Sequence, residues 1–241
     1  MKKLLVLSDI HANYPALKAI EARVDPDRFH RIIHAGDLTV YGTFPNETIE
    51  WFRRRATSVS VAGNTDKRVL AILEGKPLEK PRKEEKRAMY YWTCERLLPE
   101  NREYLKSLPD EVDITVEDLR IRILHGDFDG EEGNSPSRGT PESRFRTLAR
   151  ESSCQAHILG HTHTPVHAVV DGVHFINPGS VGRPFDGDPR SSFAVLTVSA
   201  GNIAVEHFRI PYPVEEVIAG LAENGLSDRY AEMYRTGRKL N

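Results

Sequence analysis

Three short apolar runs near the start of the chain each end abruptly in polar residues. The run from Leu4 to Leu7 continues into "SDIH", the run from Arg31 to His34 into "AGD", and the run from Ser58 to Ala62 into "GNTD". A helical pattern with a proline in its first turn lies between each neighbouring pair, at 15–23 and 45–54. This βαβαβ order predicts a parallel sheet, whose ligand site lies beyond the carboxyl ends of its strands.

The remaining chain predicts more strands and two helical segments. A charged stretch broken by prolines predicts a helical insertion at about 66–109, and the tail at about 211–241 predicts two short helices. "VDGV" around Asp171 and Gly172 is typical of a hairpin turn, which favours a second, largely antiparallel sheet. We expect one domain over residues 1–241. Further strands are predicted at 112–116, 121–124, near 158, 166–170, 174–176, 193–198 and 203–208, with a helix at 141–151.

Composition narrows the class of protein. The 241 residues carry a net charge of −2, so the chain lacks the basic excess expected of a nucleic-acid binder. Cys94 and Cys154 match no metal or redox spacing, which favours a reduced cytoplasmic setting. Asp9 interrupts the apolar N-terminal run too early for a secretory signal, and we expect no membrane partner. Oligomeric state stays open.

Two later motifs repeat the pattern of polar residues after an apolar strand: "LHGD" at 124–127 and "LGHTHTP" at 159–165. Glycines at 36, 63, 126 and 160 are expected to let the backbone turn sharply there. A sheet gathers strand ends that are distant in sequence, so these donors can meet. Oxygen and imidazole donors without thiolates suit Mn, Fe, Co, Ni or Zn rather than Ca or an iron–sulfur cluster. The candidate ligands are Asp9, His11, Asp37, Asn64, His125, His161 and His163.

Each motif alone has a simpler interpretation. An Asp-x-His pair at a strand end can be a helix cap, and "AGD" or "GNTD" can be turn chemistry. The combination favours a metal site, because seven competent donors would otherwise have to follow apolar strands independently.

In their order and spacing, "DIH", "GDLTVYG", "GNTD", "HGD" and "GHTH" resemble the motifs of the calcineurin-like metallophosphoesterases. The later "NPGSVGRPFDGDPRSSFAVL" and "RIPYPVEEV" resemble a bacterial branch often described as similar to diadenosine tetraphosphatases and small phosphodiesterases. The resemblance implies an α/β fold, a four-layer αββα sandwich of two mixed β-sheets flanked by helices.

The same resemblance implies a two-metal centre with Asp37 as the bridging carboxylate. Asp9, His11 and His163 complete one ion, and Asn64, His125 and His161 complete the other; Mn is favoured, with Fe, Zn, Ni or Co as alternatives. The implied enzyme cleaves phosphodiester or phosphoanhydride bonds of a small, nucleotide-like substrate by in-line attack of a metal-bridging hydroxide. The alternative is an interaction protein that reuses the fold with weak turnover or none. Residues with expected catalytic roles are Asp37, Asn64 and His125.

One position departs from the family pattern. Many relatives carry a histidine after the asparagine, where this chain has Thr65, which cannot act as a general acid near neutral pH. We therefore expect substrates whose leaving group is a weak base, and the proton donor stays open. Asp66 is expected to hold a ligand histidine or to cap a helix. Asn64 and Arg183 are expected to bind substrate, and Arg190 is an alternative to Arg183 for binding a second phosphate. A surface ion pair is the other interpretation of either arginine. His34 is interpreted as a hydrogen-bonded core residue.

Overall fold

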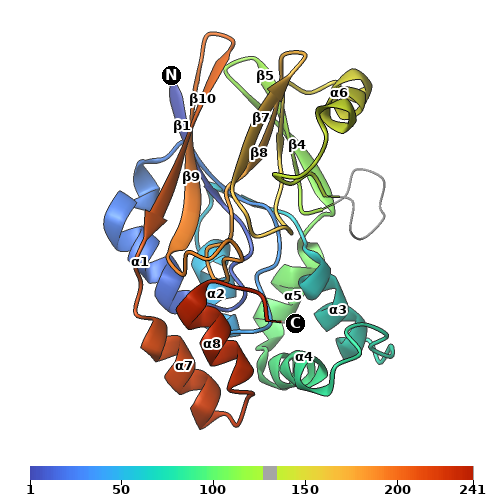
Figure 1. The fold of residues 1–241 in the computed structure, drawn as a ribbon, viewed down its shortest axis with the longest axis vertical. Coiled ribbons are helices and arrows are strands. Elements are labelled where there is room, and N and C mark those ends of the chain that lie inside the picture. The colour runs from blue at the N-terminus through green and yellow to red at the C-terminus, as the bar shows by residue number, and fades with distance from the viewer. Residues whose placement is uncertain (127–134, 241) are drawn as a thin grey trace.

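Two five-stranded sheets lie face to face, with helices on their outer faces, in the computed structural model (Figure 1). The structure describes residues 1–126 and 135–240. Each sheet contains both parallel and antiparallel pairs, so the predicted αββα sandwich of two mixed sheets is confirmed.

The first sheet is built around the predicted parallel strands and has the order β10-β9-β1-β2-β3. Leu4 lies opposite Arg31 in the parallel β1–β2 pair. The β9–β10 hairpin pairs antiparallel with the other edge of β1, with Leu5 opposite Val195. We had expected these two strands in the second sheet, but β9 covers the edge of β1 instead. The strands are β1 (Lys2–Leu7), β2 (Arg31–His34), β3 (Ser58–Ser60), β9 (Ser191–Ser199) and β10 (Asn202–Ile210).

The second sheet has the order β4-β5-β6-β8-β7. Its central pairs, β5–β6 and β6–β8, are parallel, so the expectation of a largely antiparallel sheet is wrong. The β7–β8 hairpin is confirmed, and Asp171 and Gly172 in its turn have φ values of 50° and 79°. The strands are β4 (Glu111–Val116), β5 (Leu119–Leu124), β6 (Ala156–Ile158), β7 (Val166–Val170) and β8 (Val173–Asn177).

The core divides into layers because neighbouring residues of a strand point to opposite faces. In β1, Leu4 and Val6 face the second sheet, whereas Leu5 and Leu7 face the helices. All four are fully buried. Such burial on both faces explains why the strand reads as a continuous apolar run rather than an alternating one.

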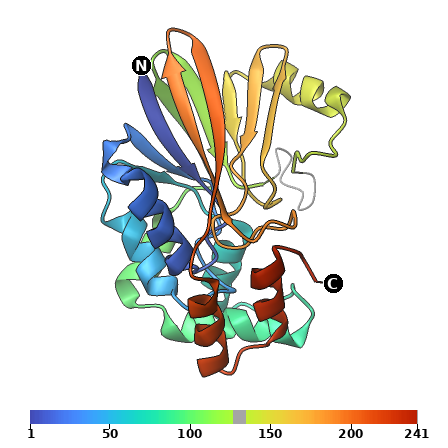
Figure 2. The ribbon, with the colours of Figure 1, turned by 60° about the vertical axis from the view of Figure 1, so that its left-hand side comes forward.

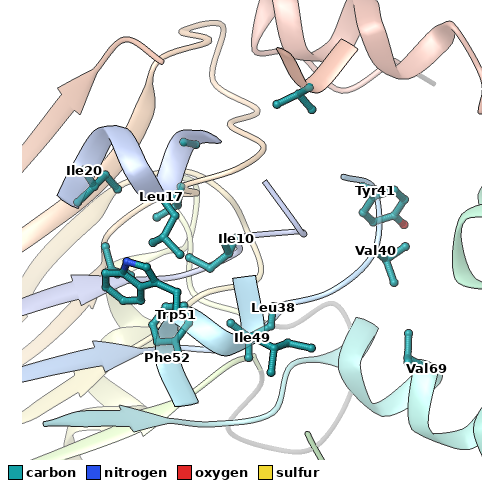
Figure 3. Close-up of a cluster of buried hydrophobic side chains, with 14 of the residues drawn as sticks. Ile10, Leu17, Ile20, Leu38, Val40, Tyr41, Ile49, Trp51, Phe52 and Val69 are labelled. Atoms are coloured by element: carbon teal, nitrogen blue, oxygen red, sulfur yellow. The ribbon is translucent and has the colours of Figure 1, made fainter. Parts of the chain in front are cut away.

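The helices are distributed unevenly over the two outer faces. Ile20 of α1 and Phe52 of α2 pack with residues of α3, α4, α5, α7 and α8 in one cluster on the first sheet. Figure 3 shows part of this cluster, including Ile20, Phe52 and Val69 of α3. Only α6 covers the second sheet in the described part of the chain, through Phe145 and Leu148. The helices are α1 (Tyr14–Val24), α2 (Pro45–Arg53), α3 (Asn64–Leu73), α4 (Glu84–Arg96), α5 (Pro99–Ser107), α6 (Glu142–Glu151), α7 (Val214–Glu223), α8 (Arg229–Thr236) and a 3₁₀ turn, Pro26–Arg28.

The helices of the predicted insertion, α3 to α5, and those of the tail, α7 and α8, lie at the same end of the molecule (Figure 2). An ion pair of 3.3 Å between Glu85 of α4 and Arg229 of α8 joins the two groups. Strands β1, β2, β5 and β6 also direct their carboxyl ends toward this end (Figure 1). None of the helices in the described ranges combines the length and apolarity needed to cross a bilayer.

Candidate metal centre

The seven candidate ligands all follow strands, and both sheets contribute. Asp9 and His11 follow β1, Asp37 follows β2, and Asn64 begins α3 just after β3. The other three come from the second sheet, where His125 follows β5 and both His161 and His163 follow β6. The structure brings all seven together. Asp127, which completes the "LHGD" motif, lies outside the described residues.

The backbone at this site adopts an uncommon conformation. Five of the seven candidates have positive φ values, between 52° and 68°. Non-glycine residues rarely adopt this left-handed region, and such outliers concentrate at functional sites. These residues are Asp9, His11, Asp37, His161 and His163.

Glycines let the strand ends approach closely. A Cβ atom at Gly63 would lie 2.1 Å from Asp37 Oδ1, and one at Gly160 would lie 2.1 Å from Ser8 Oγ. Of the four glycines expected to provide sharp turns, only Gly36 has a positive φ, of 90°. Gly63 and Gly160 are needed for close contact instead, so the expected reason for them was wrong.

Asp9, His11 and His163 form one compact group. His11 Nε2 lies 3.1 Å from His163 Nε2, and His163 Nε2 lies 3.3 Å from Asp9 Oδ1. All three residues are at most 5% exposed. These three residues satisfy the spacing required to hold a metal ion.

A second group lies directly beside the first. His125 Nε2 lies 3.4 Å from Asp37 Oδ2 and 3.1 Å from Asn64 Oδ1, which in turn lies 2.8 Å from His161 Nδ1. Asp37 Oδ2 is also 3.7 Å from His11 Nε2, so this carboxylate lies between the two groups. Asp9, Asp37 and His125 also satisfy metal-ligand spacing.

The orientation of the imidazole rings fits a cation. Nδ1 of His11, His125 and His163 faces the backbone carbonyl of Thr39, Ala35 and Arg183, at 3.2, 2.7 and 2.5 Å. A carbonyl only accepts hydrogen bonds, so each Nδ1 carries the hydrogen, and the neutral rings of His11 and His163 present a lone pair at Nε2. The 3.1 Å contact between two such Nε2 atoms repels unless a proton or a metal ion lies with them.

The orientation of Asn64 leads to the same conclusion. Its Oδ1 faces two imidazole nitrogens, whereas the reversed amide would donate to both and accept from Arg68. In the observed orientation, Asn64 Oδ1 faces the imidazole nitrogens of His125 and His161, as an oxygen ligand of a cation would.

Burial and neighbouring charges shift the pKa values of these groups in opposite directions. Burial raises the pKa of Asp9 to about 7, and the neighbouring Asp37 carboxylate adds to the rise. Burial also acts to raise the pKa of Asp37, but the charge of His125 outweighs it and holds the pKa well below its usual range. Against its own burial, the Asp37 carboxylate raises the pKa of His125 to about 10. Burial lowers the pKa of His11 to about 4 and that of His163 well below its usual range.

Asp66 holds the loop that carries Asp37. Its carboxylate accepts hydrogen bonds from the backbone N–H groups of Asp37, Leu38 and Thr39, at 3.0 to 3.2 Å, and from the Thr39 hydroxyl at 2.7 Å. It also accepts from the Gly63 N–H at 3.0 Å, at the start of α3. The helix-capping interpretation is thus confirmed. The alternative contact with a ligand histidine is wrong, because backbone donors occupy both carboxylate oxygens.

Three further predictions concern residues beside the cluster. Thr65 is 2% exposed, and its hydroxyl donates at 3.3 Å to the Thr39 carbonyl, the same carbonyl that His11 Nδ1 faces. Arg183 is 5% exposed and makes no ion pair with a described residue, which rules out the surface ion pair. His34 is buried against Phe52, but neither ring nitrogen has a hydrogen-bond partner among the described residues, contrary to expectation.

Aromatic residues around the cluster were not predicted. Phe185 stacks on His163 with ring centroids 4.1 Å apart, and Tyr41 contacts His11 edge-on at 5.2 Å. The Arg183 guanidinium lies 3.9 Å from the Tyr41 ring centroid and 5.5 Å from that of Tyr230 on α8. The sequence indicated these aromatic contacts only through the positions of Tyr41 in "GDLTVYG" and Phe185 in "NPGSVGRPFDGDPRSSFAVL".

Comparisons with known proteins show the family and the fold. The sequence matches the calcineurin-like phosphoesterase superfamily domain over residues 1–201. An uncharacterized protein of Methanocaldococcus jannaschii is 25% identical over 252 residues, which cover 98% of each chain. The crystal structure of a metallophosphoesterase from Sphaerobacter thermophilus has a TM-score of 0.78 and 27% identity, over 98% of this chain and 99% of that one. The structure of a hypothetical protein from Pyrococcus horikoshii OT3 has a TM-score of 0.88 and 20% identity, over 100% of both chains.

The two-sheet sandwich and its cluster of aspartate, asparagine and histidine side chains define a metal-dependent phosphoesterase in general terms. The chain belongs to the calcineurin-like phosphoesterase superfamily.

Proposed function

We propose that the protein is a dinuclear metal enzyme that hydrolyses phosphodiester or phosphoanhydride bonds of small, nucleotide-like substrates. The observation that carries this proposal is the His11–His163 contact of 3.1 Å between two nitrogens whose rings are fixed by backbone carbonyls. The two nitrogens repel unless a proton or a metal ion lies between them, and burial lowers the pKa of both rings, which disfavours the proton. A second cluster of donors on the other side of Asp37 provides room for a second ion.

Each ion has its own set of ligands in this proposal. Asp9, His11 and His163 would hold one ion, and Asn64, His125 and His161 the other. Asp37 would contact both, because its Oδ2 atom lies 3.7 Å from His11 Nε2 and 3.4 Å from His125 Nε2. Mixed imidazole and oxygen donors suit Mn²⁺, which we propose, and also Fe, Zn, Ni and Co.

Two divalent ions supply a nucleophile at neutral pH by lowering the pKa of bound water, and they neutralise charge on a phosphoryl group. The protein has to fix the geometry. Asp37 is held by the Asp66 hydrogen bonds to its loop and by its own contact with the Thr65 N–H at 2.8 Å. We propose catalytic roles for Asp37, Asn64 and His125. Together with His161, these residues form the half of the cluster that is partly exposed to solvent, through Asn64 and His161.

Substrate binding would involve Asn64 and Arg183. Asn64 is half-buried at the edge of the cluster, where its amide can reach a phosphoryl oxygen. The Arg183 guanidinium packs against the Tyr41 ring. It lies close enough to His11 that its positive charge contributes to lowering the pKa of that ring. We propose that Arg183 attracts the anionic substrate through this charge, and that its aromatic neighbours keep the guanidinium in place.

A cytoplasmic location is also proposed. Cys94 and Cys154 are both buried and unpaired, as is usual where thiols are kept reduced.

Hydrolysis assays with protein stripped by a chelator would test the proposed function. The substrates are bis-p-nitrophenyl phosphate and p-nitrophenyl phosphate, each with and without Mn²⁺. We expect turnover that depends on added metal and favours the diester. Loss of metal-restored turnover in Asp37→Asn, with normal turnover in the exposed variant Asp27→Asn, would assign the activity to this site.

The alternative is an interaction protein that keeps the fold without useful turnover. Absence of hydrolysis of either substrate with Mn²⁺, Fe²⁺, Co²⁺, Ni²⁺ or Zn²⁺ would support it. The completeness of the seven-donor cluster favours the enzyme, because a binding surface has no need for this buried arrangement.

A further inference from the structure

A strongly basic pocket opens beside the candidate metal centre. Its cations come from α3, from the segment that leads into α4, from the first turn of α4, and from the C-terminal segment. His161 also lines it, so the pocket and the metal centre are contiguous. We call it the basic pocket; its lining residues are Tyr41, Arg68, Lys80, Pro81, Arg82, Lys86, Tyr90, His161 and Lys239.

Among the described residues, none that lines the basic pocket is acidic, although the chain as a whole carries a net charge of −2. Arg82, Lys86 and Lys239 form no ion pair with any carboxylate in the described ranges, whereas most other surface cations near helices do. Burial lowers the pKa of Lys86, and the positive charges of Arg183 and Lys239 lower it further. Arg82, Lys86 and Lys239, brought together without a counter-charge among the described residues, create a strong local field for an anion.

The same cations extend along the metal centre. Lys239 Nζ lies 5.6 Å from the ring centroid of Phe185, which stacks on His163, and Arg183 lies 5.1 Å from the same ring. Positive charge therefore extends from the basic pocket to the Phe185 ring beside His163. A single phosphate at the metal centre would leave the more distant cations, such as Arg82, without a partner.

We propose that the basic pocket binds a polyphosphate leaving group, so that the preferred substrates are phosphoanhydrides with further phosphates beyond the bond that is cleaved. This inference rests on the proposed hydrolase function and names its substrate class. Hydrolysis forms one P–O bond from the water oxygen and breaks the bridging P–O bond. The leaving phosphate departs with the bonding electron pair, and the water protons pass to the products or to solvent.

The position of Thr65 supports this choice of substrate. Its hydroxyl donates to the Thr39 carbonyl and is buried, so it offers no proton to a leaving group. A polyphosphate leaving group needs little protonation, and nearby cations stabilise the charge that develops on it. The basic pocket thus replaces the missing proton donor by electrostatic stabilisation.

The shape of the pocket disfavours nucleic acid. Single-stranded nucleic acids bind where exposed aromatic rings stack on their bases. The two aromatic rings of the basic pocket, Tyr41 and Tyr90, are at most 8% exposed and pack on each other with centroids 6.2 Å apart. They therefore line one side of the pocket, and neither ring is exposed enough for a nucleobase to stack on it.

The test measures binding of inorganic tripolyphosphate to the full-length chain by calorimetry, after removal of metal because tripolyphosphate itself chelates cations. The variant combines Arg82→Gln, Lys86→Gln and Lys239→Gln. The matched control removes three exposed charges elsewhere, by Lys18→Gln, Arg23→Gln and Arg54→Gln. We expect the pocket variant to bind at least about ten-fold more weakly than the unmodified chain, and the control to bind equally well.

A second measurement uses the Mn²⁺-loaded protein. The ratio of kcat/KM for a nucleoside triphosphate to that for bis-p-nitrophenyl phosphate should fall at least about ten-fold in the pocket variant and stay constant in the control. Equal tripolyphosphate binding by the variant and the unmodified chain would overturn the inference. So would displacement of tripolyphosphate by an equimolar oligothymidylate, which would indicate a nucleic-acid site.

Failure of the proposed function gives a different result. If tripolyphosphate bound through Arg82, Lys86 and Lys239 while no divalent ion restored hydrolysis of any substrate, the hydrolase would be wrong and the anion pocket supported. If the diester were hydrolysed but tripolyphosphate did not bind, the pocket assignment alone would be wrong.

Discussion

His11 Nε2 and His163 Nε2 lie 3.1 Å apart, and the Nδ1 atom of each ring faces a backbone carbonyl. The two rings come from different sheets, yet stack with their centroids 4.8 Å apart. Burial lowers the pKa values of both, so both rings are neutral near pH 7 and present two lone pairs to the same point. The protein therefore holds a ligand geometry that is unfavourable until a cation is bound.

Metal binding should release protons. The pKa of His125 is raised to about 10 and that of Asp9 to about 7, so at neutral pH the first is protonated and the second partly so. Both must lose their protons to coordinate an ion, which means that affinity should rise as pH rises from roughly 6 to 9. Calorimetric titration of chelator-treated protein with Mn²⁺, in buffers of different ionisation enthalpy, would count the protons. A pH-independent affinity would contradict this assignment of ligands.

Asp37→Asn should abolish activity while preserving the shape of the side chain. It removes the carboxylate that lies between the two groups of donors. We expect kcat/KM to fall on the order of a thousand-fold and the bound metal, measured by mass spectrometry, to fall below two ions per chain. Asp27→Asn, at an exposed position with a distant partner at 3.9 Å, is the control and should change neither value. Full metal content in Asp37→Asn would show that Asp37 is not a ligand.

Asp66→Asn should weaken both the fold and the metal site. The fully buried Asp66 carboxylate accepts five hydrogen bonds, and an amide would turn a donor toward some of these N–H groups. We expect a loss of about 3 kcal/mol in the free energy of unfolding and of metal affinity by about 10- to 100-fold. Thr39→Val removes only one of these bonds and should cost about 1 kcal/mol. Denaturant titration of the metal-free protein separates the two effects, and equal costs for the two variants would refute the role given to Asp66.

Gly63→Ala should displace Asp37. The added Cβ would lie 2.1 Å from Asp37 Oδ1 and 2.2 Å from its backbone nitrogen, contacts that no rotamer change relieves. The strain should cost about 3 kcal/mol and lower metal affinity. Gly139→Ala is the control, because an added Cβ there meets no atom within 4 Å. Similar thermal midpoints for the two variants would argue against this close contact.

The rate should depend steeply on the leaving group. Thr65 replaces the histidine of many relatives and its hydroxyl is directed to the Thr39 carbonyl, so no proton donor is available at this position. Across a series of aryl phosphodiesters, log kcat should fall as the pKa of the leaving phenol rises. An assay of the series with Mn²⁺-loaded protein tests this directly. A rate that is insensitive to the leaving-group pKa would mean that another residue donates the proton.

Much of this arrangement could be predicted from local sequence. Leu4 to Leu7 and Arg31 to His34 read as buried strands because both faces are covered, and parallel strands place Asp9 and Asp37 at the same edge. "GHTH" indicated a special role because two imidazoles in a polar loop have few structural uses. The candidate cluster therefore followed from residue type and position alone.

Long-range packing could not be predicted in the same way. The partner of β9 depends on which sheet edge is free, and its apolar pattern is the same for either sheet. Likewise, the burial of Arg183 under α8 depends on the path of the tail, with its contacts to Tyr230 and Met233. The left-handed backbone of His161 and His163 depends on tertiary contacts, because residues other than glycine adopt it in only a few per cent of cases.

The candidate ligands come from both sheets, and this would affect the lifetime of the protein in a cell. Four candidate ligands follow strands of one sheet and three follow strands of the other, so bound ions would fasten the two halves of the core at this end. Their binding free energy would then count toward folding. Chains made when metal is scarce would open here more often and be degraded sooner. Metal supply would thus set the abundance of this protein as well as its rate of turnover.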